Sequence, residues 1–328
     1  MKEQEANTRG PVIPRLTKAI QRRLLTLLIG GLALAALMAA TAACSSNGTT
    51  AALAPGARLN VVATTVQITA LTREVGGTDI DLRGLIPAGA DAHEFEPIAS
   101  DLTAIESANL ILRHGIGLDD WLDDTLKAGK KADVVEVTKG IKLAKGEEEG
   151  ETADNPHVWH DPANDQIMVT NIANALSKAD PAHQDAYESR ATVYKQKLDD
   201  TRARVQAIIN EIPAANRKLV TNHDAFGYFA RAFGLEVVGA VIPSISTASE
   251  PSAKDTAALL DTIKAQKVKA IFAESSVNPK LAQTLAEDAG VKIVDDLYGD
   301  SLGEPGSGAD TVDGMLLANA RKIADALK

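Results

Sequence analysis

A long helical segment in the middle of the chain constrains the fold more than any other feature. Residues 182–212 follow the pair Asp180 and Pro181, and they contain neither glycine nor proline before Pro213. Proline in the first turn and proline beyond the end are typical helix boundaries. About thirty residues rising 1.5 Å each give a helix of roughly 45 Å, longer than one small domain requires. Its apolar residues recur at helical spacing, at Tyr187, Ala191, Tyr194, Leu198, Val205, Ile208 and Ile209.

Both flanks of this helix alternate between strand-like and helix-like segments. Such an order predicts parallel sheets covered by helices. Before the helix, we expect strands at residues 59–66, 80–86, 110–113 and 133–137, and helices at 67–76, 101–109, around Trp121 and at 164–178. After it, we expect strands at 218–221, 235–242, 268–273 and 291–294, and helices at 225–233, 250–266, 280–289 and 311–327.

These flanks predict a chain with two lobes. The expected fold class is α/β, with two (β/α) lobes joined by one long rigid α-helix. We place the first lobe at residues 58–179, the linker helix at 180–213 and the second lobe at 214–328. The length of 328 residues fits two domains of ordinary size once a leader has been removed.

The first 57 residues indicate export and anchoring. Residues 24–43 carry no charge and follow a segment with several basic residues, as in a secretory signal. Cys44 is the only cysteine, and its small neighbours resemble a bacterial lipoprotein processing site. We predict a signal peptide at 1–43, a lipid on Cys44 and a flexible tether at 44–57. The alternatives are an uncleaved membrane helix and a cysteine placed there by chance.

The composition excludes two kinds of partner. The formal net charge is -10, and aromatic residues make up 3% of the chain. A surface that binds nucleic acid needs a basic footprint, so we expect no nucleic-acid partner. The scarcity of aromatic residues argues against a large pocket for an organic ligand.

Three of the six histidines lie in predicted loops with unusual sequences. His93 and His223 come after predicted strands, and His157 follows an Asn-Pro pair. In open α/β sheets, ligands bind beyond the carboxyl ends of the strands. A neutral imidazole is a good ligand for zinc and other borderline divalent metals. Taken singly, each histidine fits a helix cap or a solvated surface residue as well.

Four stretches of the chain resemble the zinc/manganese-type metal solute-binding lipoproteins of ABC importers. They are residues 89–97 (GADAHEFEP), 156–162 (PHVWHDP), 223–229 (HDAFGYF) and 298–302 (YGDSL). The resemblance covers residues 59–327, with the stretches in the order that the family has. It implies two α/β lobes linked by a single long helix, which is the metal-type periplasmic-binding-protein fold.

The resemblance implies metal ligands at His93, His157, His223 and Asp300. Manganese-type relatives usually carry glutamate at the third position, where this chain has His223. Three imidazoles and one carboxylate favour zinc, whereas oxygen-rich sites suit manganese better. The implied cargo is therefore Zn2+, with Mn2+ or another divalent metal as the alternative.

The resemblance also implies a role. Family members capture a metal outside the cytoplasm and deliver it to an ABC permease in the membrane. We expect a monomer that its lipid anchor holds to the cell membrane, at the bacterial cell surface or in the periplasm. We expect no enzyme activity, because four protein ligands leave no open position for catalysis. The alternatives are a metal-dependent hydrolase, which needs such a position and a general base, and a surface adhesin or binder of an organic ligand.

Other polar residues near these motifs have weaker assignments. We expect His160 to pack against the site or support a ligand, with direct metal contact as the lesser alternative. Glu274, Asp295 and Asp296 are candidates to orient a ligand imidazole. His114 is expected in a polar loop, and His183 in solvent. The acidic residues 146–154 are expected to form a solvated loop, with weak collection of cations as the alternative.

Overall fold

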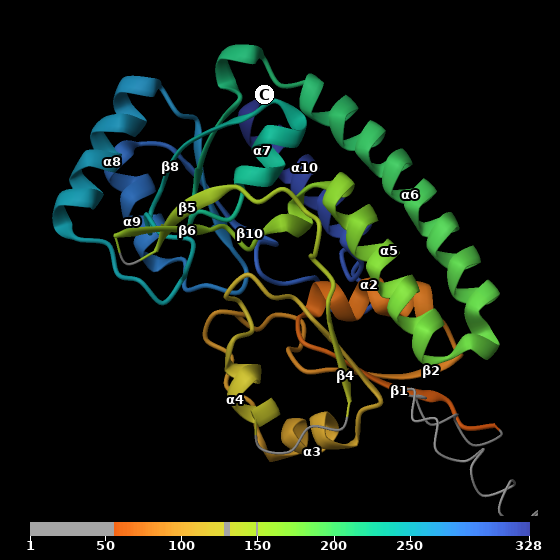
Figure 1. The fold of residues 1–328 in the computed structure, drawn as a ribbon. Helices are drawn as coiled ribbons and strands as arrows, with labels where there is room; N and C mark the ends of the chain where they lie inside the picture. The colour runs from red at the N-terminus through yellow and green to blue at the C-terminus, as the bar shows by residue number, and fades with distance from the viewer. Residues whose placement is uncertain (1–55, 128–131, 149) are drawn as a thin grey trace, which may run out of the picture. The chain divides into compact units, whose positions relative to one another are not determined.

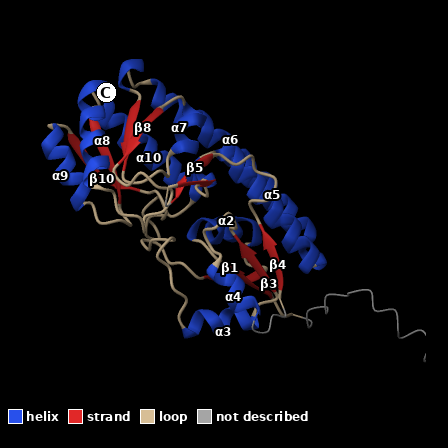
Figure 2. Ribbon diagram, turned by 60° about the vertical axis from the view of Figure 1, so that its left-hand side comes forward, coloured by secondary structure: helices blue, strands red, loops and turns tan. Residues whose placement is uncertain are grey.

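Two parallel sheets of four strands each form the framework of the chain in the computed structural model (Figure 1). The structure describes residues 56–127, 132–148 and 150–328. The first sheet has the strand order β2-β1-β3-β4, and the second has the order β10-β9-β7-β8. Helices accompany the strands of both sheets (Figure 2). The predicted α/β class is therefore confirmed.

The first sheet is built from strands that precede the long helix. β1 (Leu59–Ala63) pairs in parallel with β2 (Ile80–Gly84) and β3 (Leu110–Arg113), and β4 (Asp133–Glu136) pairs with β3. The connecting helices are α2 (Val66–Gly76), α3 (Ala99–Ser107) and α4 (Trp121–Lys127). β1 ends before the predicted residue 66 because Thr65 caps α2, with its side chain accepting from the amide of Ile68 at 3.3 Å.

The second sheet repeats this arrangement after the long helix. Its strands are β7 (Lys218–Thr221), β8 (Glu236–Ala240), β9 (Ala270–Glu274) and β10 (Lys292–Leu297). Its helices are α7 (Gly227–Phe233), α8 (Ala253–Gln266), α9 (Lys280–Ala289) and α10 (Val312–Leu327). All five residues of β9 are buried, as expected for an inner strand of a parallel sheet covered on both faces.

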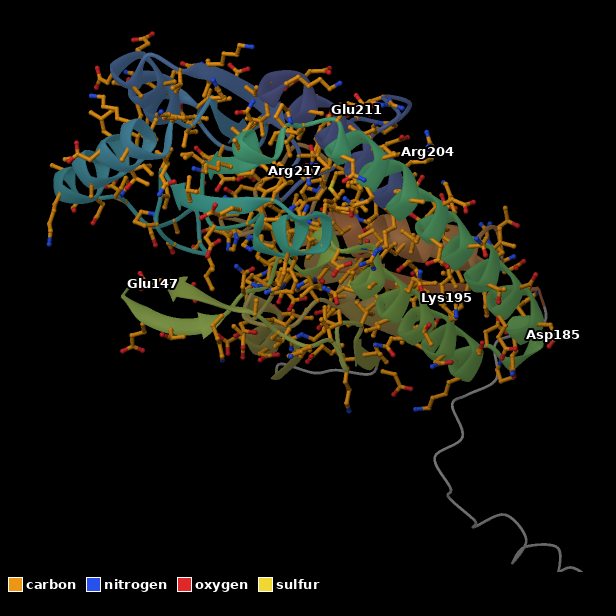
Figure 3. All side chains as sticks on the ribbon, turned by 90° about the horizontal axis from the view of Figure 1, so that it is seen from above. Glu147, Asp185, Lys195, Arg204, Glu211 and Arg217 are labelled. Atoms are coloured by element: carbon orange, nitrogen blue, oxygen red, sulfur yellow. The ribbon has the colours of Figure 1, made fainter. Side chains whose placement is uncertain are left out.

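The long helix is α6, Gln184–Asn210, with 27 residues after a short 3-10 turn at Pro181–His183. It lies against α5 (Pro162–Ala179), α2 and α10, so it contacts helices of both flanks (Figures 1 and 3). The structure buries six of the seven apolar positions predicted to face the core, and only Ile208 is half-buried. Leu198 is fully buried on the face of α6 that packs against these helices. Its replacement by alanine would therefore lower the free energy of unfolding by about 2–5 kcal/mol.

The acidic segment 146–154 is largely exposed to solvent, as predicted, but it forms a hairpin rather than a loop. β5 (Lys145–Glu148) and β6 (Glu151–Asp154) pair in antiparallel fashion. The turn includes Gly150, whose φ of 82° lies in the region that glycine favours. The amide of Ile245, in a loop of the second lobe, donates to the carbonyl of Glu147 at 2.8 Å. This tertiary contact supports a hairpin that its polar sequence does not predict.

Several predictions concern residues that the structure does not describe. The predicted signal peptide at 1–43, Cys44 and most of the tether at 44–57 lie outside the described residues. Within the described part of the chain, no helix combines the length and the apolar character needed to cross a membrane. The lobe boundaries at residues 58, 180 and 214 stay predictions.

Candidate metal site

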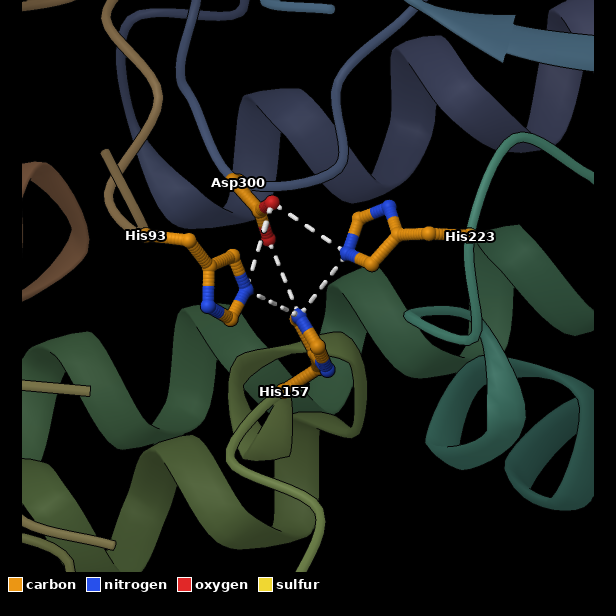
Figure 4. Close-up of side chains that lie close together, drawn as sticks. All are labelled: His93, His157, His223 and Asp300. Carbon is orange, nitrogen blue, oxygen red and sulfur yellow. Dashed lines mark hydrogen bonds and ion pairs between the residues drawn. The ribbon is translucent and has the colours of Figure 1, made fainter. Parts of the chain in front are cut away.

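Four side chains from distant parts of the sequence meet at one point (Figure 4). They are His93, His157, His223 and Asp300, and each offers a ligand atom within 4.8 Å of those of the others. Three of them are fully buried, and the side chain of His93 is 8% exposed. The four residues that the sequence singled out are therefore brought together.

The ends of strands position two of the four residues. His223 lies two residues beyond β7, and Asp300 lies three residues beyond β10. His93 lies in the loop between β2 and α3, and His157 lies between β6 and a 3-10 turn at Val158–His160. In a parallel sheet the carboxyl ends of neighbouring strands meet at one edge, which is where ligands bind in open α/β folds.

The separations between the ligand atoms are short and similar. Nε2 of His157 lies 3.3 Å from Nε2 of His93 and 3.1 Å from Nε2 of His223. The Asp300 carboxylate lies 3.1 Å from His157, 3.2 Å from His223 and 3.7 Å from His93. For bonds of 2.0–2.1 Å, the edges of a tetrahedron of zinc ligands are about 3.3 Å long. The side chains therefore fit around one small cation.

Among the described residues, only the surrounding imidazoles are placed to donate to the Asp300 carboxylate. Neither of its oxygens has an assigned hydrogen-bond partner among the described residues, although both are buried. A buried carboxylate that faces three imidazole nitrogens is stable only if a proton or a cation lies between them. The donor set is thus chemically suited to a divalent metal.

Two of the imidazoles are oriented by a second residue. Asn155 Oδ1 accepts from Nδ1 of His157 at 2.9 Å, which directs Nε2 into the site. Nδ1 of His223 lies 2.6 Å from Oε1 of Glu274, at the end of β9. Histidine ligands of metals usually have such a partner on the other ring nitrogen. Glu274 was anticipated from the sequence as a candidate for this role, and Asn155 was not.

Glu274 also contacts the loop that carries Asp300. Its Oε2 accepts from the amide of Asp300 at 3.3 Å. A Cβ on Gly299 would overlap this carboxylate, so any other residue at that position would displace Glu274. Glu274 therefore links the two candidate ligands of the second sheet.

Burial and charge shift the pKa values of these groups in opposite directions. Burial lowers the pKa of His157 to about 3, although the Asp300 carboxylate opposes the shift. Burial also disfavours charge on His223, but Glu274 and Asp300 together outweigh it and raise the pKa of His223 well above its ordinary value. Burial tends to raise the pKa of Asp300, whereas His223 and His157 hold it well below its usual range. The site therefore favours an ionised carboxylate next to a neutral His157.

The other histidines lie outside this group. His160 is buried and stacks on Phe226 with ring centroids 4.6 Å apart, and burial lowers its pKa to about 3. It therefore packs as a neutral ring. His183 bonds to Asp180 at 2.6 Å with 45% of its side chain exposed.

His114 lies in a loop directly after β3, as expected, but this loop position is not exposed. His114 is fully buried, and its Nε2 lies 2.8 Å from the carbonyl oxygen of Pro156. The reason is tertiary, because the segment that carries His157 covers the end of β3. The ring of His114 packs edge-on against Trp159.

Asp295 and Asp296 do not support the site, contrary to their candidacy. Both are exposed on β10, an edge strand of the second sheet. Asp295 accepts from Gln283 at 3.2 Å, and Asp296 pairs with Lys322 at 2.8 Å. β10 extends to Leu297, further than predicted, and this places both carboxylates on the strand rather than in the loop of Asp300.

The fold and the cluster define an α/β protein with a candidate metal site of histidine and aspartate. Comparison with known families identifies the group. Residues 61–326 match the family described as the zinc-uptake complex component A, periplasmic. The chain belongs to this family, which confirms the resemblance drawn from its motifs. Members are substrate-binding components of transport systems.

Individual relatives are named for different metals. The chain is 33% identical over 293 residues to the manganese ABC transporter substrate-binding lipoprotein PsaA of Streptococcus mitis, covering 87% of this chain and 94% of that one. It is 32% identical over 293 residues to the iron ABC transporter substrate-binding lipoprotein MtsA of Streptococcus pyogenes serotype M1, covering 87% and 93%. The solved structure of the periplasmic zinc-binding protein TroA from Treponema pallidum superimposes with a TM-score of 0.76 at 32% identity, covering 83% and 99%.

Proposed function

We propose that this chain captures a divalent transition metal outside the cytoplasm, with zinc preferred, and delivers it to the permease of an ABC importer. The observation that carries the proposal is the buried Asp300 carboxylate, which faces three imidazole nitrogens at 3.1–3.7 Å. The family assignment supports a transport role, and the metal itself is the cargo. His93, His157, His223 and Asp300 are the proposed ligands.

The donor set supports zinc over manganese. Three nitrogen donors and one carboxylate match the ligand preference of zinc, whereas manganese prefers oxygen. Glu274 adds a second buried carboxylate, 2.6 Å from His223, without itself belonging to the ligand group. Its charge strengthens the attraction for any divalent ion, so the preference for zinc rests on the ligand atoms rather than on net charge. Manganese is the second candidate, because several relatives are named for it.

The closed arrangement supports capture and release rather than catalysis. Four ligand groups fill a tetrahedral site and leave no position for a reacting water. A metal held in this way leaves rapidly only when the ligands separate. Two of the proposed ligands precede the long helix in the sequence and two follow it. A movement of the two sheets relative to each other would therefore open the site.

The proposed location follows from the sequence of the N-terminus and from the relatives. Cys44 is the proposed lipid attachment site, and residues 44–57 would tether the body to the membrane. The relatives named above for manganese and iron are lipoproteins. An anchored binding protein stays close to the permease that it supplies, which raises its effective concentration there.

Metal competition on residues 45–328 tests the proposal. We expect one zinc per wild-type chain and a zinc affinity that exceeds the manganese affinity. The variant His223→Glu replaces one nitrogen donor with oxygen, so its preference should shift toward manganese. His183→Glu is the matched control, because it makes the same change at a half-exposed histidine outside the cluster. A wild-type chain without bound metal, or a preference unchanged by His223→Glu, would contradict the proposal.

A further inference from the structure

The side chain of Asn155 connects two of the proposed ligands. It is 2% exposed, and both ends of its amide are used. Oδ1 accepts from the main-chain amide of His157 at 3.0 Å and from its Nδ1 at 2.9 Å. Nδ2 donates to the carbonyl oxygen of Asp224 at 2.9 Å. Since Asp224 directly follows His223, one side chain bridges the segments of both histidines.

The orientation of this amide does not depend on how imidazole protons are assigned. The amide of His157 can only donate, and the carbonyl of Asp224 can only accept. Oδ1 must therefore face His157, and Nδ2 must face Asp224. It follows that Nδ1 of His157 carries the proton in the neutral ring, which leaves the lone pair of Nε2 directed at the site.

The main chain of Asn155 is held by the second lobe as well. The hydroxyl of Tyr228 donates to the carbonyl of Asn155 at 3.0 Å and accepts from the amide of Ala144 at 2.9 Å. Ala144 and Asn155 flank the β5–β6 hairpin, and the amide of Asn155 donates to the carbonyl of Ala144 at 2.9 Å. The two residues at the base of the hairpin are thus hydrogen-bonded to Tyr228 of α7.

Further hydrogen bonds hold the loop of His223 in place. The side chain of Thr221 donates to the carbonyl of His223 at 2.7 Å, and the amide of Asp224 donates to the carbonyl of Ser244 at 2.9 Å. His157 therefore stays close to His223 as long as Asn155 keeps its hydrogen bonds to both segments.

We propose that Asn155 is a positioning residue that ties His157 to the loop of His223 and thereby slows release of the metal. The inference rests on the proposed function and adds to it a residue that sets the release rate. Asparagine is required because the link needs a donor and an acceptor on one short side chain. Aspartate would still accept from His157, but it would place a carboxylate oxygen against the carbonyl of Asp224.

The variant Asn155→Asp distinguishes the contact with His157 from the contact with Asp224. It keeps the acceptor that orients His157 and removes the donor to the carbonyl of Asp224. We expect zinc to leave about tenfold faster in stopped-flow mixing with excess chelator, as for the loss of one buried hydrogen bond. The absorption spectrum of the Co2+-loaded protein should match that of the wild type, because the ligand set is unchanged. Asn155→Ala loses both contacts and should also weaken zinc affinity by about 10–100-fold.

Asn171→Asp is the matched control. The Nδ2 of Asn171 donates to the carbonyls of Val137 and Lys139 at 2.8 and 2.9 Å, away from the site. This variant should lose stability in the metal-free state and keep the wild-type release rate. If Asn155→Asp does not fold, Tyr228→Phe replaces it. This variant removes the hydroxyl that bonds to the main chain of Asn155, and it should also make zinc release faster than in the wild type.

The outcomes separate this inference from the proposed function. Faster release in Asn155→Asp or Tyr228→Phe, with normal release in Asn171→Asp, supports the link. A loaded Asn155→Asp protein that releases zinc at the wild-type rate overturns the inference alone, as does equal acceleration in Asn171→Asp. A wild-type chain that binds no metal overturns the proposed function and the inference with it.

Discussion

His93 and His157 both precede the long helix, yet the structure supports them very differently. His157 is fully buried, and Asn155 fixes its ring. Two residues further on, Trp159 donates from Nε1 to the carbonyl of Gly299 at 3.0 Å, beside Asp300. Nδ1 of His93 has no hydrogen-bond partner in the part of the chain that is described, and its side chain is 8% exposed.

The difference shows that position in the sequence does not determine which part of the molecule holds a ligand. The segment of His157 precedes the long helix but is bonded to the second lobe through Asp224, Tyr228 and Gly299. The loop of His93 reaches that lobe through the amide of Gly89, which donates to Oγ of Ser301 at 2.5 Å. His157, His223 and Asp300 thus form one supported group, and His93 completes it from a less constrained loop.

Replacement of His157 by alanine should have the largest effect. The change removes the nitrogen ligand that lies closest to the other three ligands. It also leaves the buried Asp300 carboxylate with one partner fewer. Loss of a residue that only orients a ligand costs about 10–100-fold in metal affinity, so loss of this ligand should cost at least about 100-fold. Competition titration with a calibrated zinc chelator measures it. An affinity within tenfold of wild type would contradict the site.

Replacement of His93 by alanine should weaken zinc binding less, by about 10–100-fold. Since this histidine is partly exposed, a water can take its place in the coordination shell, as in open zinc sites with three protein ligands. The same titration, run beside His157→Ala, tests the comparison directly. If His93→Ala and His157→Ala lower the zinc affinity equally, the hydrogen bonds and burial that distinguish the two histidines do not affect zinc binding.

The smallest effect is expected for His183→Gln, outside both regions. Its bond to Asp180 and the charge of that carboxylate raise the pKa of His183. The stabilisation is therefore fully present below the unfolded-state pKa of about 6.5, and it is lost as the pH rises through the folded-state pKa. The variant should melt slightly below the wild type at about pH 5.5 and together with it at about pH 9. Its zinc affinity should equal that of the wild type, and a clear loss would show that the start of α6 influences the site.

Much of the fold was predictable because local patterns specify it. The absence of glycine and proline between Pro181 and Pro213 predicted the long helix, and the structure has it at Gln184–Asn210. The segments predicted for β3, β7 and α9 agree with the structure residue for residue. The hairpin at 145–154 was missed because its sequence is polar and one of its contacts comes from Ile245, about a hundred residues away.

The candidate site was predictable from residue types and motifs, and its supporting residues were only partly so. Imidazoles in loops beyond strands pointed to metal chemistry, and Glu274 at a strand end was a candidate to orient a ligand. Asn155 was overlooked, although a polar side chain two residues before a candidate ligand is well placed to bond its ring. The burial of His114 and the exposure of Asp295 and Asp296 were not predicted, because both depend on what packs against each strand.

The sequence by itself determined the alternation of strands and helices, the long helix between them and the chemistry of the ligand atoms, because periodicity and side-chain type are local properties. The tertiary structure decided that four residues as far apart as His93 and Asp300 meet within 4.8 Å. It also decided that Asn155 bridges to Asp224 and that Glu274 contacts His223. These distances depend on how both sheets pack against the long helix, and a pattern read along the chain holds no record of that packing.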